Sequence, residues 1–139
     1  MKEYILCIPS VIAGAIAAAF GGWSTGITVY LIFCLIDIIT GTINAFLGKS
    51  NKTKSGSFNS FIGWKGLGKK LLTLCLIAMA NQLDILLGTT VIRDAAVFFF
   101  IFNEGTSILE NCGEWIELPA IIKKALDVLK EKSDNTEVR

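Results

Sequence analysis

Long apolar stretches separated by short polar breaks dominate the order of residues along the chain. Apolar positions fill four segments, at residues 4–23, 26–48, 71–87 and 91–109. Each segment is close to the roughly 20 residues that a helix needs to cross a bilayer, and an isolated segment in lipid satisfies its own backbone only as a helix. The pattern therefore predicts an all-α integral membrane protein with about four transmembrane helices.

Two short turns join these segments in pairs. Ser24 and Thr25 follow the first segment, and Gly88, Thr89 and Thr90 separate the third from the fourth. Because connections this short place neighbouring helices antiparallel, we expect two antiparallel hairpins. The run "AIAAAF" in the first segment would also suit the cleavage site of a signal peptide, which is an alternative to a first span.

The C-terminal part of the chain has a different pattern. In residues 118–132, apolar residues such as Ile122, Ala125 and Leu129 recur at helical spacing, with lysines on the other side. This spacing predicts an amphipathic cytoplasmic helix that packs on its neighbours, lies on the membrane surface or contacts another subunit. We expect residues 133–139, which follow it, to be disordered.

Composition agrees with a membrane protein. Of the 139 residues, 53% are hydrophobic and 18% are charged, and the mean hydropathy is +0.60. Soluble domains carry roughly 25% charged residues, so the chain is too apolar for an ordinary soluble domain. The net charge of +1 gives no reason to expect nucleic acid as a partner. We therefore divide the chain into a transmembrane domain, residues 1–111, and a cytoplasmic part, residues 112–139.

Lysines are concentrated in two places, which sets the expected orientation. The link between the predicted hairpins, residues 49–70, is basic and so is the tail, whereas the outer turns carry only Arg93. Since basic loops stay cytoplasmic, the chain is predicted to cross the bacterial cytoplasmic membrane several times with both termini inside. Three lysines of the link are expected at the membrane surface: Lys65, Lys69 and Lys70.

Polar residues recur at steps of three and four along each of the last three predicted spans, which places them on single helix faces. They form a candidate pore or interhelical polar network: Asp37, Thr40, Asn44, Asn81, Asp84, Arg93, Asn103, Glu104, Ser107 and Glu110. Small residues that allow helices to approach closely are the candidates for helix packing: Gly14, Ala18, Gly22 and Gly41.

Glu104 lies inside the apolar run "FFFIFNEGTSILEN". A carboxylate at mid-membrane costs about 2.5–3.5 kcal/mol to insert, and each Phe or Ile returns only about 0.3–0.6 kcal/mol. The fourth segment should therefore need partners, and its carboxylate must face protein or water. We expect Glu104 to lie against Thr40, Asn44 or a neighbouring subunit, and Asp84 to form an ion pair with Arg93.

The polar faces have two interpretations that residue chemistry leaves open. They either hold a static bundle together or line a water path when subunits rearrange. In the second interpretation Glu104 and Asp37 are buried before assembly and face water afterwards.

Nothing in the sequence indicates an enzyme. The run "GWKGLGKK" approaches a phosphate-binding loop, but Lys70 stands where that loop needs Ser or Thr, and no strand precedes it. The four cysteines form no close pair, and the chain has no His. We therefore expect no catalytic set, no metal site and no cofactor.

Five motifs, in this order, resemble the toxin-secretion and phage-lysis holins (phage holin family 4) of Gram-positive bacteria and their phages. They are "LIDIITG", "GWKGLGKKLL", "ANQLD", "FFFIFNEGTSILEN" and "LPAIIKKALDVLK". The resemblance covers about residues 31–132 and leaves out the first segment. It implies a homo-oligomer that accumulates in the bacterial cytoplasmic membrane and then forms lesions, through which an endolysin or a large toxin escapes.

Two other functions remain open at this point. A small oligomeric ion channel or transporter subunit would use Asp37 and Glu104 as ion sites, although the sequence shows no inverted repeat of the transporter kind. A structural scaffold would use the polar faces for packing alone. Abrupt cell death on expression, with passage of whole proteins, would separate a holin from both.

Overall fold

The protein is all-helical in the part of the chain that the computed structural model describes, residues 2–50 and 60–136. This part contains five helices: α1 (Lys2–Ala19), α2 (Thr25–Phe46), α3 (Ser60–Leu87), α4 (Val91–Gly113) and α5 (Ala120–Thr136). The predicted helical class is confirmed. The predicted link between the hairpins lies partly at residues 51–59, outside the described residues.

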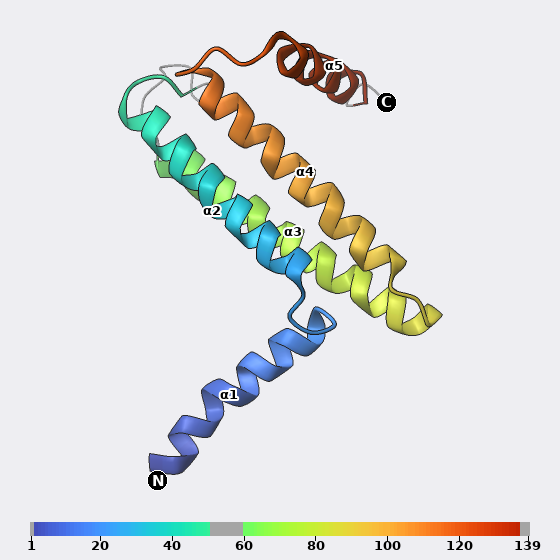
Figure 1. Cartoon of the computed structure of the whole chain (residues 1–139). Coiled ribbons are helices and arrows are strands. Elements are labelled where there is room, and N and C mark those ends of the chain that lie inside the picture. Colours follow the sequence, from blue (N-terminus) through green and yellow to red (C-terminus); the bar gives the residue numbers. More distant parts are fainter. Residues whose placement is uncertain (1, 51–59, 137–139) are drawn as a thin grey trace.

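Helices α2, α3 and α4 pack side by side as a bundle (Figure 1). The most extensive contact joins α2 and α4, which run parallel: Gly26 lies against Val97 near their first turns, and Asn44 bonds Asn111 near their last turns. α3 runs antiparallel to both and returns into α4 through the short turn at Gly88. Glycine is required there because the backbone turns with φ of +68°.

α1 does not lie along α2 as the sequence predicts. It leaves the bundle at the first turn of α2 and points away from it (Figure 1), and its most extensive contact is with the end of α3. The glycines expected to pack this helix are open, since a Cβ at Gly14 or Gly22 would meet nothing within 4 Å. Close packing at glycine occurs instead between α2 and α4, at Gly26 and Gly105.

The bundle has a polar interior and an apolar exterior. Among the residues whose side chains are described, six polar or charged ones are buried: Asp37, Asn44, Asn81, Asp84, Glu104 and Asn111. In contrast, large apolar side chains such as Phe98 and Leu86 are more than 70% exposed. A soluble bundle buries the apolar side chains and exposes the charges, so this arrangement suits a bundle whose surroundings are lipid.

Two described helices are long and apolar enough to cross a membrane, α2 and α3, with mean hydropathies of 2.0 and 1.6. α4 is interrupted by charge, and Pro9–Ala19, the apolar stretch of α1 whose side chains are described, is only part of that helix. The sequence placed the start of the third span at residue 71 because of the lysines before it, but α3 begins at Ser60. Lysine ends an apolar run without ending a helix, because its helix propensity is high.

α5 follows α4 at the end of the bundle that lies farthest from α1 (Figure 1). It continues to Thr136, four residues into the segment for which we expect disorder, and residues 137–139 lie outside the described part. Ile121 on its apolar side is 80% exposed, whereas Leu126 is buried.

Candidate functional site

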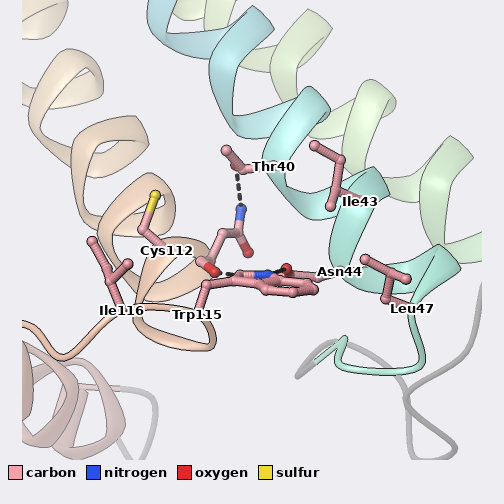
Figure 2. A pocket seen from close by; sticks show the side chains of 8 residues that line it. Thr40, Ile43, Asn44, Leu47, Cys112, Trp115 and Ile116 are labelled. Atoms are coloured by element: carbon pink, nitrogen blue, oxygen red, sulfur yellow. Dashed lines mark hydrogen bonds between the residues drawn. The ribbon is translucent and has the colours of Figure 1, made fainter.

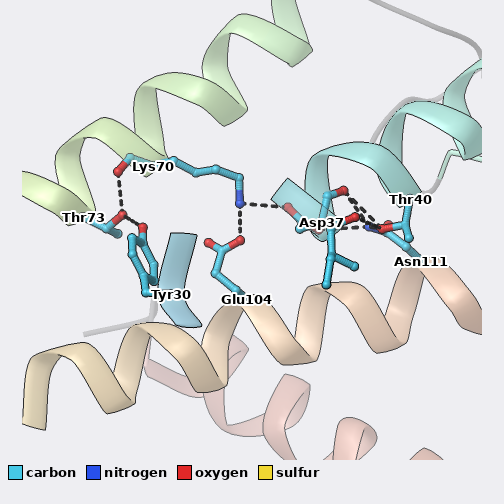
Figure 3. A network of polar contacts seen from close by, with 8 residues as sticks. Tyr30, Asp37, Thr40, Lys70, Thr73, Glu104 and Asn111 are labelled. Carbon is cyan, nitrogen blue, oxygen red and sulfur yellow. Dashed lines mark hydrogen bonds and ion pairs between the residues drawn. The ribbon is translucent and has the colours of Figure 1, made fainter. Parts of the chain in front are cut away.

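A largely buried lysine joins the three helices of the bundle. The Lys70 ammonium from α3 lies 3.0 Å from the Oδ2 atom of Asp37 on α2 and also pairs with the Oε2 atom of Glu104 on α4. Figure 3 shows the two carboxylates meeting this single ammonium from different sides. Asp37 is 7% exposed and Glu104 is 6% exposed. We call these three residues the ion triad.

The ion triad corrects two expectations. Lys70 was predicted at the membrane surface, but only 11% of its side chain is exposed. Glu104 is expected against Thr40, Asn44 or a neighbouring subunit, but within the chain its partner is Lys70, whose ammonium also holds Asp37. The spacing of residues along α3 could have shown this. Lys70, Ile77 and Asp84 are seven residues apart, which is close to two helical turns each, so Lys70 lies on the same face of the helix as the buried Asp84. Lys65 and Lys69 are exposed, as a surface position requires.

Asn111 continues the polar interior toward the last turns of α2 and α4. Its side-chain amide donates to Asp37 Oδ1 at 2.9 Å and to Thr40 Oγ1 at 3.0 Å, and its backbone carbonyl accepts a bond from the Asn44 side-chain amide at 2.9 Å. Trp115 completes this region by donating its indole N–H to Asn44 (Figure 2). Thr40 and Asn44, which were expected to lie against Glu104, therefore both bond Asn111 instead.

An apolar layer closes the other side of the ion triad. Tyr30 is fully buried and its hydroxyl bonds Thr73 on α3 (Figure 3). Ile27, Ile77 and Val97 pack with it. The triad is thus separated from the first turns of α2 by closely packed side chains, which exclude water and strengthen the attraction between its charges.

Asp84 lies near the end of α3, beside the first turn of α4. It binds backbone amides there and does not form the predicted ion pair. Its carboxylate accepts the backbone N–H groups of Ile92 at 3.1 Å and Arg93 at 2.7 Å, and it also bonds the Thr89 hydroxyl. These amides belong to the first turn of α4, whose N–H groups have no partner within the helix. The Arg93 guanidinium pairs with Asp94 instead, so the predicted ion pair is replaced by a helix cap.

Asp84→Ala is therefore expected to lower the amount of protein in the membrane, because loss of a helix cap costs about 0.5–2 kcal/mol. The charge-swapped variant, Asp84→Arg with Arg93→Asp, should not restore it, because an arginine side chain cannot accept the backbone N–H groups. Immunoblotting of membrane fractions measures the effect, and recovery in the swapped variant would contradict the cap.

The remaining predicted polar residues lie in different surroundings. Asn81 is buried and its amide donates to the Ala19 carbonyl at the end of α1. Ser107 and Glu110 are half-buried, as is the packing candidate Gly41, whereas Ala18 is exposed. Asn103 is exposed on the surface of α4, so within one chain it lies outside the buried polar interior, and its place in a pore of several copies stays a prediction. It lies one residue before Glu104, which puts it about 100° around the helix.

The chemistry available to the site is the pairing of charges. Both carboxylates that were candidate ion sites, Asp37 and Glu104, are bound by the same ammonium. Within the described residues, no group of three or more His, Cys, Asp or Glu side chains is placed to hold a metal ion. One positive charge faces two carboxylates, so the triad is a strong link between three helices only while Lys70 stays inside.

Comparison with known proteins indicates the same family as the sequence motifs. The sequence model of the bacteriophage holin family matches residues 14–131. A protein named "Probable holin" from Bacillus phage phi105 is 34% identical over 106 residues, covering 75% of this chain and 73% of that protein. An uncharacterised protein of Clostridium perfringens (strain 13) is 35% identical over 140 residues, covering 96% of this chain and 98% of its own. No solved structure matches.

The match to the holin family includes every residue of the ion triad, as well as Asn111 and its partners Thr40 and Asn44, because all of them lie between residues 14 and 131. Together with the apolar exterior, it identifies a membrane protein. The chain therefore belongs to the bacteriophage holin family.

Proposed function

We propose that this protein is a holin that assembles with copies of itself in the bacterial cytoplasmic membrane and forms lesions that release an endolysin, or a large toxin, and lyse the cell. The observation that carries the proposal is the ion triad, in which charged groups from three helices are hidden inside a bundle with an apolar exterior. A charge that is tolerable inside the protein and favourable in water stabilises a rearranged, wet assembly.

The proposed resting state is the bundle with the triad closed. Its polar faces bond one another, so the chain can accumulate in lipid without exposing charge. In the proposed lesion, α2, α3 and α4 separate and the same faces line water in an assembly of many copies. The energy of the closed triad then sets how easily the bundle opens.

A cell-lysis assay tests this function. The chain is expressed together with an endolysin that lacks its own export signal, and culture turbidity is followed after induction. We expect an abrupt fall in turbidity after a delay, with endolysin activity outside the cells, whereas endolysin alone should leave the culture growing. Continued growth with the chain present in the membrane would contradict the proposal.

The channel or transporter alternative gains no support from the geometry, because Lys70 occupies the two carboxylates that would bind a cation. The same assay separates the two functions. A small channel would depolarise the cells without releasing endolysin.

The proposed topology has four spans with both termini in the cytoplasm, α1 and α4 being the two spans that depend on partners. Cys112 at the end of α4 is half-buried and free, and it should lie on the cytoplasmic side with the lysine-rich parts of the chain. With the other cysteines replaced by alanine, a membrane-impermeant thiol reagent should label Cys112 in inverted vesicles and not in intact cells. Labelling of intact cells before lysis would contradict the four-span arrangement.

A further inference from the structure

Trp115 lies where the end of α4 meets the polar interior of the bundle. The residue is 49% exposed, but its indole N–H faces the protein and donates to the side-chain oxygen of Asn44 (Figure 2). A tryptophan that only anchors a helix at the membrane surface keeps its polar N–H on the wet side, toward headgroups and water. Trp115 instead uses its N–H inside the protein.

The indole N–H determines which way the Asn44 side chain faces. Because an indole N–H can only donate a hydrogen bond, the Asn44 oxygen is turned toward Trp115 and the Asn44 nitrogen toward α4. That nitrogen donates to the backbone carbonyl of Asn111 at 2.9 Å. Asn111 is in the last turn of α4, where backbone carbonyls have no partner within the helix. The bond therefore holds this turn of α4 against α2.

From this position the Asn111 side chain reaches the ion triad. Its amide donates to Asp37 Oδ1 at 2.9 Å and to Thr40 Oγ1 at 3.0 Å (Figure 3). The other carboxylate oxygen of Asp37, Oδ2, lies 3.0 Å from the Lys70 ammonium. The bond from Asn111 to Oδ1 thus keeps Oδ2 directed at the ammonium.

Close packing does not hold this end of the bundle together. A largely apolar cavity of about 410 Å³ lies around the ends of α2 and α4, and Ile43, Leu47 and Trp115 are among the residues that line it. At the first turns of the same two helices the contact is tight, since a Cβ at Gly26 would lie 3.0 Å from Val97. Hydrogen bonds, rather than apolar contacts, therefore keep α2 and α4 together near Trp115.

Lys49 supports the Trp115 ring from the basic link. Its Nζ atom lies 4.0 Å from the centre of the ring and donates to the Glu114 backbone carbonyl at 3.5 Å. A cation over an aromatic face is attracted by the ring, and phenylalanine also provides such a face. The indole N–H is thus the feature of Trp115 that phenylalanine would not replace.

We propose that Trp115 is a positioning residue for the ion triad, and that its indole N–H sets the time at which the bundle opens. The N–H orients Asn44, Asn44 holds the last turn of α4, and Asn111 on that turn keeps Asp37 in the triad. Loss of the N–H loosens these contacts and makes the triad easier to open. The delay before lysis belongs to the proposed function, on which this inference rests.

Trp115→Phe tests the N–H because it keeps an aromatic ring at the position. In the lysis assay we expect it to lyse the culture earlier than the wild-type protein at equal membrane abundance. Trp64→Phe is the matched control: Trp64 is 72% exposed on α3, so this variant should keep the wild-type time. Lysis by Trp115→Phe at the wild-type time or later would show that only the ring matters, and would overturn the proposal.

The hydrogen bond itself is measured without lysis. Detergent-solubilised protein labelled with ¹⁵N at its indoles gives one N–H signal for each of the three tryptophans. We expect the Trp115 signal to exchange with D2O several-fold more slowly than the Trp64 signal, and Asn44→Ala to remove that difference. Equally fast exchange of both signals in the wild-type protein would contradict the bond and, with it, the proposal.

Cys34 reports whether the loosening reaches the ion triad. It is 7% exposed and lies three residues before Asp37 on α2, which places both on one face of the helix. With the other cysteines replaced by alanine, N-ethylmaleimide should label Cys34 several-fold faster in Trp115→Phe than in Trp64→Phe. Equal rates of labelling would mean that Trp115 does not act on the triad, and would overturn its positioning role.

The labelling and lysis measurements together separate this inference from the proposed function. Lysis by the wild-type protein, with neither timing nor Cys34 labelling changed in Trp115→Phe, overturns the inference and leaves the function standing. Faster Cys34 labelling in Trp115→Phe, with a wild-type protein that never lyses the culture, supports the positioning role and counts against the function.

Discussion

Glu104→Leu is expected to accumulate in the membrane at least as well as the wild-type protein and to fail to lyse the cell. The substitution removes a carboxylate whose insertion costs about 2.5–3.5 kcal/mol at mid-membrane. It also leaves Lys70 with one partner, Asp37, at 3.0 Å, so the interior keeps a balanced pair. A bundle with no surplus charge inside has less to gain from water, and the proposed lesion loses its driving force.

The measurement is culture turbidity after induction with a co-expressed endolysin, with membrane abundance checked by immunoblot. Asn103→Leu is the matched control, because Asn103 precedes Glu104 on the same helix and is exposed outside the polar interior. It should lyse close to the wild-type schedule. Lysis by Glu104→Leu on that schedule at equal abundance would show that the carboxylate only holds the helices together.

Glu104→Gln distinguishes charge from hydrogen bonding at the same position. Glutamine keeps the shape and can still accept a bond from the Lys70 ammonium, but it carries no charge. We expect normal insertion with delayed or absent lysis. Lysis at the wild-type time would mean that the hydrogen bond, rather than the charge, is what the triad needs.

Lys70→Met, in contrast to Glu104→Leu, is expected to lower the amount of protein that accumulates in the membrane. Removing the ammonium leaves two buried carboxylates, Asp37 and Glu104, without their shared partner. Breaking a buried ion pair in this way costs about 3–5 kcal/mol. We therefore expect a large drop in the amount of membrane protein and in the thermal stability of the detergent-solubilised protein.

Two further variants identify the cause of that drop. Lys69→Met removes the adjacent lysine, which is exposed, and should leave abundance unchanged. The double variant Lys70→Met with Glu104→Leu removes the ammonium together with one carboxylate, and it should recover part of the loss. Failure of the double variant to exceed Lys70→Met would argue that the methionine disturbs packing instead.

The sequence alone was sufficient for the class of the fold, for most helix positions and for the family. Apolar segments of span length predict helices because an isolated segment in lipid satisfies its own backbone as a helix. Steps of three and four residues predict which side chains share a face, and five of the six buried polar residues were named from that spacing as site candidates, Asn111 being the exception. These features are local, so they can be derived from neighbouring residues along the chain.

Only the tertiary structure decided which faces meet. The sequence could not show that α2 packs chiefly on α4, because helix pairing depends on contacts between distant residues such as Gly26 and Val97. It assigned Lys70 to the surface on the general preference of lysine for water, whereas two carboxylates from other helices make a buried position tolerable. It paired Asp84 with the nearest cation, whereas the unbonded amides at the start of α4 are what that carboxylate binds. The end of α1 is likewise held by distant side chains: Asn81 and Gln82 donate to the Ala19 carbonyl and Arg93 donates to the Gly21 carbonyl, from 62 to 72 residues away along the chain. At that separation, spacing in the sequence carries no information about contact.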